Sequence, residues 1–369
     1  MQFYDPKVLN LKRVAFLVPY PLDESPSQRF RFEQYFSVLR NHEIHYTVYP
    51  FLNEKGWSVL YARGKFMQKL WHLVRGFVLR ILHVFYTGRA DFVFIHREAA
   101  PLGPPIFEWV IAKLFRKKII YDFDDAIWMT DNVQESTFTR FLRHRSKVSS
   151  ICKWSYRVSC GNTYLCTYAK HFSENVVLNP TTIDTEAIHN PTGYPAKPAS
   201  QFVEIGWTGS HSTLKYLKSI ENVLRNIEEK FKNVKVIVIA NREPDLGLHS
   251  VEFIPWQKKT EAEDLHKIDI GIMPLPDDEW TKGKCGFKAL QYMAMGIPAV
   301  ASPVGVNPLI VDHEKTGFLA TTDEEWFHYL SELITNPQLR KNLGASGREK
   351  VIQHYSVISN ASNFLSLFK

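Results

Sequence analysis

The chain has 369 residues, of which 45% are hydrophobic and 22% charged, and its formal net charge at pH 7 is +7. This length suits two ordinary domains, and the composition excludes a largely disordered chain. The excess of positive charge favours an anionic partner, such as a nucleotide, nucleic acid or acidic lipid, without choosing among them.

The four cysteines form neither a CxxC pair nor a set with the spacing of metal ligands. We therefore expect free thiols in a reducing compartment. The N-terminus has no long apolar region of the kind found in signal peptides, and no stretch reaches the ~20 apolar residues of a membrane-spanning helix. These features predict a cytoplasmic protein.

Short apolar runs alternate with longer amphipathic ones through the first half of the chain. The pattern predicts buried strands over Val14–Pro21, residues 43–50, Asp91–His96 and Lys117–Asp125, and helices over Arg29–Arg40 and Pro105–Phe115. Strands that alternate with helices are typical of parallel βαβ units. In such sheets, ligands bind beyond the carboxyl ends of the strands.

A basic amphipathic segment, Gly64–Phe85, lies between two of these strands. Its apolar residues recur at helical spacing, and four bases stand beside the apolar stripe: Lys65, Lys69, Arg75 and Arg80. Such a helix can lie on an anionic membrane surface. It can equally bury its apolar stripe against the sheet and leave the bases in water.

The segment His189–Ser200 is rich in Pro, Gly and Ser, which indicates a linker. After it the alternation begins again. Strands are predicted at residues 203–210, 234–240, 268–275 and 298–302, with a helix over Ser212–Phe231. Two α/β halves that face each other would create a cleft.

The first strand of the second half ends in a glycine turn, "GWTGS". Gly209 would let the backbone approach a phosphate, Ser210 and Thr213 can donate hydroxyl groups, and Lys215 adds charge in the next helix. By itself this pattern is weak evidence, because most strand–Gly–Ser–helix turns are simply capped helices.

A later helix of this half is predicted to begin near Gly286. Lys284 and Lys288 stand at its start, where a cation costs about 0.3–1 kcal/mol unless an anion is bound. A third loop, residues 302–308, offers the backbone groups of Gly305, Val306 and Asn307. Because all three loops follow strands of one sheet, the pattern predicts a cradle for a diphosphate.

The segment "GFKALQYMAMGIPAVASPVGVN", followed by "TGFLA", resembles the donor-binding signature of family 4 retaining glycosyltransferases, which have the GT-B fold. That fold consists of two Rossmann-like domains facing across a cleft. The resemblance covers most of Val203–Gly347. "YDFDDAIW" and "PSQRFRFEQY" resemble a branch of the family from bacterial polysaccharide biosynthesis.

The resemblance implies an acceptor-side domain over residues 1–190, with the C-terminal helix at about 350–369 packed back on it, and a donor-binding domain over residues 201–349. It also implies transfer of a sugar, of the hexosyl type, from a nucleotide-diphosphate sugar to a hydroxyl of a glycan or lipid-linked glycan. The anomeric configuration would be retained, with no metal and no other cofactor. GT-B enzymes with lipid-linked acceptors often have a basic patch in the acceptor domain, which favours peripheral membrane contact.

Two positions depart from the family pattern. Its members commonly have two glutamates eight positions apart, and these fall here at Gly283 and Gln291. Gln291 can still bond the nucleotide ribose through its amide. The loss at Gly283 puts in doubt a carboxylate contact to the transferred sugar.

The first half contributes Asp122, Asp124 and Asp125, which end one strand. Three carboxylates this close should repel, unless cations or hydrogen bonds compensate. We expect them to orient the acceptor hydroxyl; a metal site and a helix cap are the alternatives. Arg29 is expected to meet the donor phosphates across the cleft, and His96 is either a cleft residue or a buried structural histidine.

Two other functions stay open. One is a metal-dependent glycosyl- or phosphotransferase centred on "DFDD", and the other is a non-catalytic nucleotide- or glycan-binding relative, motivated by the missing glutamates. Nucleic-acid binding is not expected, because no known module is present and the bases form no single run.

Overall fold

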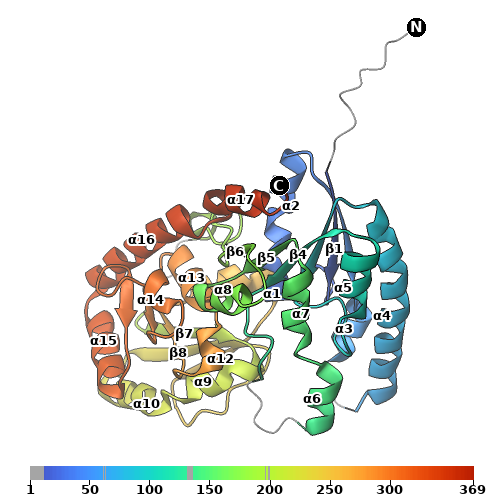
Figure 1. Ribbon diagram of the computed structural model, residues 1–369. Coiled ribbons are helices and arrows are strands. Elements are labelled where there is room, and N and C mark those ends of the chain that lie inside the picture. The colour runs from blue at the N-terminus through green and yellow to red at the C-terminus, as the bar shows by residue number, and fades with distance from the viewer. Residues whose placement is uncertain (1–11, 61, 63, 131–135, 196, 198–199) are drawn as a thin grey trace. The chain divides into compact units, whose positions relative to one another are not determined.

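The computed structural model describes residues 12–60, 62, 64–130, 136–195, 197 and 200–369. The chain forms two compact units, one from the described residues up to Pro180 together with Ala361–Lys369, and the other from Thr181–Asn360. Each unit is built on a six-stranded sheet with helices on both faces (Figure 1). All described strand pairs are parallel, as the alternation of strands and helices predicts.

The sheet of the first unit has the order β2-β1-β3-β4-β5-β6. Its strands are β1 (Arg13–Val18), β2 (His45–Pro50), β3 (Phe92–His96), β4 (Lys118–Phe123), β5 (Arg157–Cys160) and β6 (Val176–Leu178). β1, β3 and β4 are mostly apolar and are buried almost throughout, because helices cover both faces.

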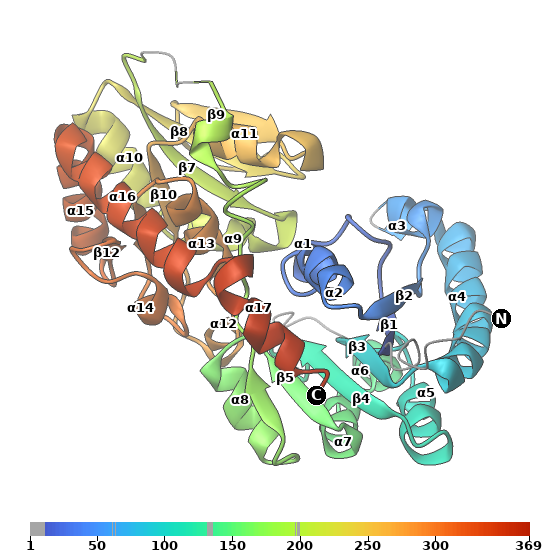
Figure 2. The ribbon, with the colours of Figure 1, turned by 90° about the horizontal axis from the view of Figure 1, so that it is seen from above.

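The helices of the first unit differ in length and regularity. They are α1 (Pro26–Arg29), α2 (Phe36–Asn41), α3 (Glu54–Leu60), α4 (Phe66–Tyr86), α5 (Ile106–Trp109), which continues as a π-helical turn over Val110–Leu114, α6 (Thr137–Arg143), α7 (Lys147–Trp154) and α8 (Thr163–Lys170). Figure 2 shows α5 and α7 on one face of the sheet, and α2 with the end of α17 (Val357–Ser366) on the other. The last residues complete this unit's core, since Phe364 stacks on Tyr35 with ring centroids 4.2 Å apart and Phe368 packs edge-on against Phe92.

The sheet of the second unit has the order β12-β11-β10-β7-β8-β9. Its strands are β7 (Val203–Gly209), β8 (Val234–Ala240), β9 (Val251–Pro255), β10 (Ile270–Met273), β11 (Ala299–Ala301) and β12 (Gly317–Leu319). Its helices, besides the start of α17, are α9 (Leu214–Lys218), α10 (Glu221–Lys230), α11 (Glu261–His266), α12 (Glu279–Lys282), α13 (Phe287–Ala294), α14 (Asn307–Ile310), α15 (Asp323–Thr335) and α16 (Pro337–His354).

The main core of the second unit lies between the sheet and α10 with α15, where Leu224, Ile227 and Leu330 are buried. On the other face α13 approaches β10 so closely that a Cβ on Gly271 would stand 2.3 Å from the ring of Tyr292. This close approach positions the start of α13 at the carboxyl edge of the sheet.

The predicted functional domains 1–190 and 201–349 stay predictions. In the structure, the segment after Pro180 already packs with the second unit. Ile183 forms a bridge with Ser356, and Arg348 donates to the carbonyl of His189 at 2.9 Å. Among the described residues, no helix is both long and apolar enough to cross a bilayer.

Candidate functional site

The strand order of the second unit reverses between β7 and β10, which are neighbours although β8, β9 and the helices α9, α10 and α11 separate them in the chain. In open parallel sheets, ligands bind at the carboxyl ends of the strands beside such a reversal. The loops that follow β7, β10 and β11 are the three that the sequence assigned to a diphosphate cradle. They therefore share one edge, as expected.

The loops after β10 and β11 touch through their backbones. Gly305 has φ +59°, and a Cβ there would stand 2.8 Å from the carbonyl oxygen of Lys282. Gly286, at the start of α13, has φ +66° and faces Ile310 with no room for a side chain. Only glycine suits either position without strain. Backbone amides can therefore approach a ligand closely along this edge.

The two lysines of the helix start lie over tryptophan rings. The Nζ of Lys284 is 4.9 Å from the ring centroid of Trp280, and the Nζ of Lys288 is 5.4 Å from that of Trp207. Trp207 belongs to β7, so Lys288 brings positive charge from α13 to the end of the neighbouring strand. Cation–π contacts of this kind hold an ammonium group in place while it can still meet an anion.

The turn after β7 is ordered by its own hydroxyls. The Oγ1 of Thr213 donates to the carbonyl of Ser210 at 2.9 Å, and Ser210 and Ser212 share a hydrogen bond of 2.9 Å. The N–H of His211 donates to Oδ1 of Asn241 at 2.7 Å. His211 was not among the site residues predicted from the sequence. Lys215 is exposed, with its Nζ 5.2 Å from the ring centroid of Tyr216.

Two predicted donor-binding residues, Asn307 and Gln291, form hydrogen bonds within the protein. Asn307 is buried; its N–H donates to Val304, and its side chain donates to Ser302 at 2.9 Å. The N–H groups of Gly305 and Val306, in contrast, have no acceptor among the described residues.

The amide of Gln291 is buried as well. It meets Nε2 of His189 at 3.3 Å and is only 1% exposed. The expected ribose contact therefore requires Gln291 to leave this partner. Gly283 caps α12 through a bond from its N–H to Trp280, so its backbone has a structural role.

The carboxyl edge of the first unit carries a buried polar network around Asp122. Arg31 grips this carboxylate with two nitrogens, at 2.5 and 3.3 Å, and Ser159 donates to it at 2.6 Å. His96 approaches through Nδ1 at 2.8 Å. Arg31 also donates to the backbone carbonyl of Asn179, so the network joins four neighbouring strand ends.

The assignment of Asp122 to the acceptor hydroxyl is therefore corrected. Burial alone would raise its pKa, but the charge of Arg31 and the hydrogen bond from His96 outweigh burial and hold the pKa well below its ordinary value of 3.8. Its side chain is fully buried, so an acceptor hydroxyl does not reach it. Asp122 positions His96 and Arg31 instead.

Asp124 and Asp125 lie just beyond this network and are partly exposed. Arg97 bridges them, with Nη2 2.8 Å from Asp124 and 2.6 Å from Asp125. Arg97 has φ +61°, a left-handed conformation that costs a non-glycine residue roughly 1–3 kcal/mol. Such strain clusters at functional sites. From the sequence, Arg97 was recognised only as a polar group near a strand end, and not as the cation that compensates the two carboxylates.

His96 is fixed in one tautomer. Because the carboxylate of Asp122 only accepts hydrogen bonds, Nδ1 carries the proton and Nε2 faces Oγ of the partly exposed Ser27 at 3.4 Å. His96 itself is fully buried. Arg29, expected to reach donor phosphates, is also largely buried, with its guanidinium over the ring of Phe30.

The metal and helix-cap alternatives find no support in this geometry. No group of three His, Cys, Asp or Glu side chains within the described ranges is arranged to hold a metal ion. Arginines occupy the carboxylates of the "DFDD" segment. The next described helix, α6, is capped by Ser136 rather than by an aspartate.

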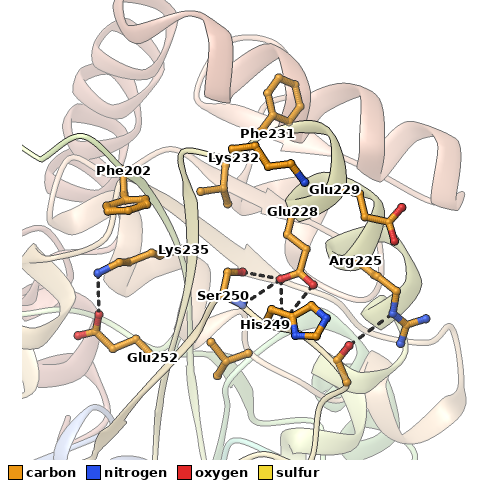
Figure 3. Close-up of a pocket in the computed structure, with 13 residues that line it drawn as sticks. Phe202, Arg225, Glu228, Glu229, Phe231, Lys232, Lys235, His249, Ser250 and Glu252 are labelled. Carbon is orange, nitrogen blue, oxygen red and sulfur yellow. Dashed lines mark hydrogen bonds and ion pairs between the residues drawn. The ribbon is translucent and has the colours of Figure 1, made fainter.

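A hollow of 710 Å³ in the second unit lies at the opposite edge of its sheet, around the amino ends of β8 and β9 (Figure 3). Two of its carboxylates have partners in the protein: Glu252 lies 3.5 Å from Lys235, and Glu228 accepts from the backbone N–H groups of His249 and Ser250. The lining residues of this hollow lie at the amino ends of the strands, whereas ligands of open parallel sheets bind at the carboxyl ends. The hollow therefore does not compete with the candidate donor site.

The basic helix α4 turns its apolar stripe outwards. Its exposed apolar side chains are Phe66, Met67, Leu70, Trp71, Val74, Val78, Ile81, Leu82, Phe85 and Tyr86. Arg80, assigned from sequence to a membrane surface, is instead fully buried and donates to the carbonyls of Val18 and Tyr49 at 2.9 Å. Lys65 is exposed and Lys69 and Arg75 are half-buried, so these three bases are available at the surface.

Residues 203–336, which contain β7, β10, β11 and their loops, match the family described as Glycosyl transferases group 1. Over these residues the chain is similar to group 1 glycosyltransferases. The chain is also 28% identical over 129 residues to a D-inositol 3-phosphate glycosyltransferase from Saccharomonospora viridis, a match that covers 34% of this chain and 28% of that protein. The chain spans 28%, 39% and 43% of the length of three curated relatives that it matches.

Solved structures match over almost the whole chain. Sucrose-phosphate synthase from Thermosynechococcus elongatus has a TM-score of 0.68 at 14% identity, covering 97% of this chain and 98% of that one. HepE from Anabaena, solved with UDP and glucose, has a TM-score of 0.66 at 13% identity, covering 96% and 98%. Similarity at these identities shows the fold, and the GT-B fold expected from the sequence is confirmed.

Proposed function

We propose that this protein is a glycosyltransferase that moves a sugar from a nucleotide-diphosphate sugar to a hydroxyl of a glycan or lipid-linked glycan, with retention. The observation that carries the proposal is the carboxyl edge of the second unit. There, a glycine turn, two lysines and two unpaired backbone N–H groups follow adjacent strands of the region that is similar to group 1 glycosyltransferases.

The chemistry asks the site to stabilise a leaving group. The bond from the anomeric carbon to the diphosphate breaks, a bond to the acceptor oxygen forms, and the acceptor loses its proton. Lys284, Lys288 and the amides of Gly305 and Val306 would stabilise the charge that grows on the diphosphate, since preorganised donors act strongly where charge develops. With these cations in place, no metal or other cofactor is required.

The acceptor role falls to the first unit. Asp124 and Asp125 are the carboxylates within reach of solvent, and Arg97 orients both. Asp122 does not contact the acceptor itself but holds the ring of His96 in place through a hydrogen bond. We assign acceptor orientation to Asp124 and Asp125, and a positioning role to Asp122.

The test is a thermal-shift screen against UDP-, GDP- and dTDP-sugars, followed by NMR of the product for anomeric configuration. UDP-glucose is the first probe, because HepE has been solved with it. We expect one nucleotide class to stabilise the protein. No stabilisation by any of them, or an inverted product, would contradict the proposal. Activity lost with EDTA would favour the metal-dependent alternative, and binding without transfer or hydrolysis would favour the non-catalytic one.

We further propose that α4 binds the surface of an anionic membrane, which would make the protein peripheral on the cytoplasmic face. The outward apolar stripe supports this, because monomeric proteins rarely expose a continuous apolar face of this size without a partner. Residues 64–90 contain five Lys and Arg and no Asp or Glu, which suits anionic lipid. A lipid-linked acceptor would then be presented at the same surface.

A further inference from the structure

The first unit contains a hollow of 740 Å³ that has no part in the chemistry proposed above. It is bounded by residues 128–130 after β4, by α6 and the turn that follows it, and by the end of α8. Its position beyond the end of β4 puts it on the side of the sheet where parallel α/β units bind ligands.

One wall of the hollow is flat and aromatic. The rings of Trp128 and Tyr168 stack in parallel, 3.6 Å apart, and Phe172 stands edge-on to Tyr168 at 5.2 Å. This packing holds the rings in place without a ligand. Aromatic faces offer a large apolar contact area, which suits the C–H face of a sugar ring.

The hollow is also lined by basic side chains. Arg140 and His144 line it, and Arg140 makes no ion pair with any described residue. No carboxylate lies among the described residues that line the hollow. An arginine fork binds carboxylate and phosphate groups through two parallel hydrogen bonds, so this lining selects for an oxyanion.

α6 itself indicates that something covers this region. This seven-residue helix buries none of its side chains, and Phe141, which also lines the hollow, is 76% exposed. Helices this short are unstable without tertiary packing. A ligand held between α6 and the aromatic wall would supply that packing.

We propose that this hollow binds an anionic sugar, that is, a saccharide ring that bears a carboxylate or a phosphate. The saccharide ring would lie against an outer face of the Trp128–Tyr168 stack, and the oxyanion would meet Arg140. The claim that this sugar is part of the acceptor rests on the proposed function. The claim that it binds in this hollow does not.

The test is calorimetry at 150 mM salt with four probes: tetragalacturonate, its carboxyl-reduced neutral form, glucose 6-phosphate and inorganic phosphate. We expect an acidic sugar to bind at least tenfold more tightly than the neutral chain. The two acidic probes then distinguish a carboxylate from a phosphate. Arg140→Gln should weaken that binding about tenfold, the loss of one charge-assisted contact. Arg143→Gln is the matched control, because Arg143 is on the same helix but does not line the hollow.

Three results would overturn the inference: no binding of either acidic sugar, equal binding of the neutral chain, or equal losses from Arg140→Gln and Arg143→Gln. Where glucose 6-phosphate is the acidic sugar that binds, equally tight binding of inorganic phosphate would be a fourth such result, because the ring would then contribute nothing. If acidic sugars bind as expected while no nucleotide sugar is bound or consumed, the proposed function fails and this inference stands.

Discussion

Arg31 and Asp122 form an ion pair that solvent does not reach, with Nη2 2.5 Å from Oδ1 and both side chains 0% exposed. The two residues are 91 positions apart in the chain, one shortly after α1 and the other near the end of β4. Each charge is acceptable in the interior only because the other is present. The pair therefore links the stability of the first unit to the geometry of its candidate acceptor edge.

Replacing Asp122 by Asn should destabilise the protein by about 3–5 kcal/mol, because it leaves the guanidinium of Arg31 buried without a counter-charge. Asp124→Asn is the matched control, since Asp124 is partly exposed and shares Arg97 with Asp125. Urea unfolding measures both. Equal losses would contradict the structural role assigned to Asp122, whereas reduced transfer with a stable fold is expected for Asp124→Asn.

Glu33 should make the first unit pH-dependent. Burial raises its pKa to about 6 from 4.5, against the opposing hydrogen bond from Gln28. A carboxyl whose folded pKa is raised contributes stability that is complete below 4.5 and is lost as the pH rises through 6. The unfolding free energy of the natural protein should therefore fall relative to that of Glu33→Gln between pH 4.5 and 6. A constant difference across this window would contradict the assignment.

Lys288→Ala should weaken binding of a nucleoside diphosphate by about 1–3 kcal/mol, the range for a hydrogen bond to a charged group. Lys282→Ala is the control, because Lys282 pairs with Glu279 at 2.7 Å and was not assigned to the cradle. Calorimetry with UDP is the measurement, or with another nucleoside diphosphate if the screen selects one. If both variants bind like the natural protein and remain folded, the phosphate role of α13 is wrong.

Gly305→Ala should lower diphosphate affinity about tenfold or more, as expected when two amides are displaced. The new Cβ would stand 2.8 Å from the carbonyl of Lys282. Gly296→Ala is the matched control: its φ of +73° carries a similar strain, but no atom lies within 4 Å of the added Cβ. Both variants should lose some stability. An equal effect on affinity would mean that backbone strain alone, and not the loop contact, accounts for the loss.

Membrane binding should depend on the bases that remain accessible on α4. Changing Lys65, Lys69 and Arg75 together to Gln should remove about 1 kcal/mol of attraction per charge and abolish co-sedimentation with anionic vesicles at low salt. Arg80 is left intact, because its buried bonds to Val18 and Tyr49 stabilise the fold. The control changes three exposed lysines elsewhere, namely Lys170, Lys230 and Lys341. If the natural protein does not co-sediment with anionic vesicles at low salt, the membrane proposal is wrong.

The fold could be predicted from local patterns because strands buried on both faces are continuous apolar runs. β1, β4, β7 and β8 stand out in this way, and the glycine turns after β7 and β11 mark the edge where we predict that the ligand binds. Some short or half-exposed strands were not predicted from the sequence. One of these is β9, whose residues are all either partly buried or exposed. The helix predicted over Ser212–Phe231 is interrupted between α9 and α10. Hydrophobic periodicity does not reveal where a helix is interrupted so that it can pack on the sheet.

By itself, the sequence determined which residues carry charge or backbone freedom at the strand ends, because those properties are local. Tertiary structure decided which of them are available. Asp122, Arg80, Asn307 and Gln291 all read as surface or ligand residues, yet each is buried on a partner far along the chain or around a turn. Nothing in a residue's neighbours specifies such partners, because a buried polar group is satisfied by whatever the packing brings beside it.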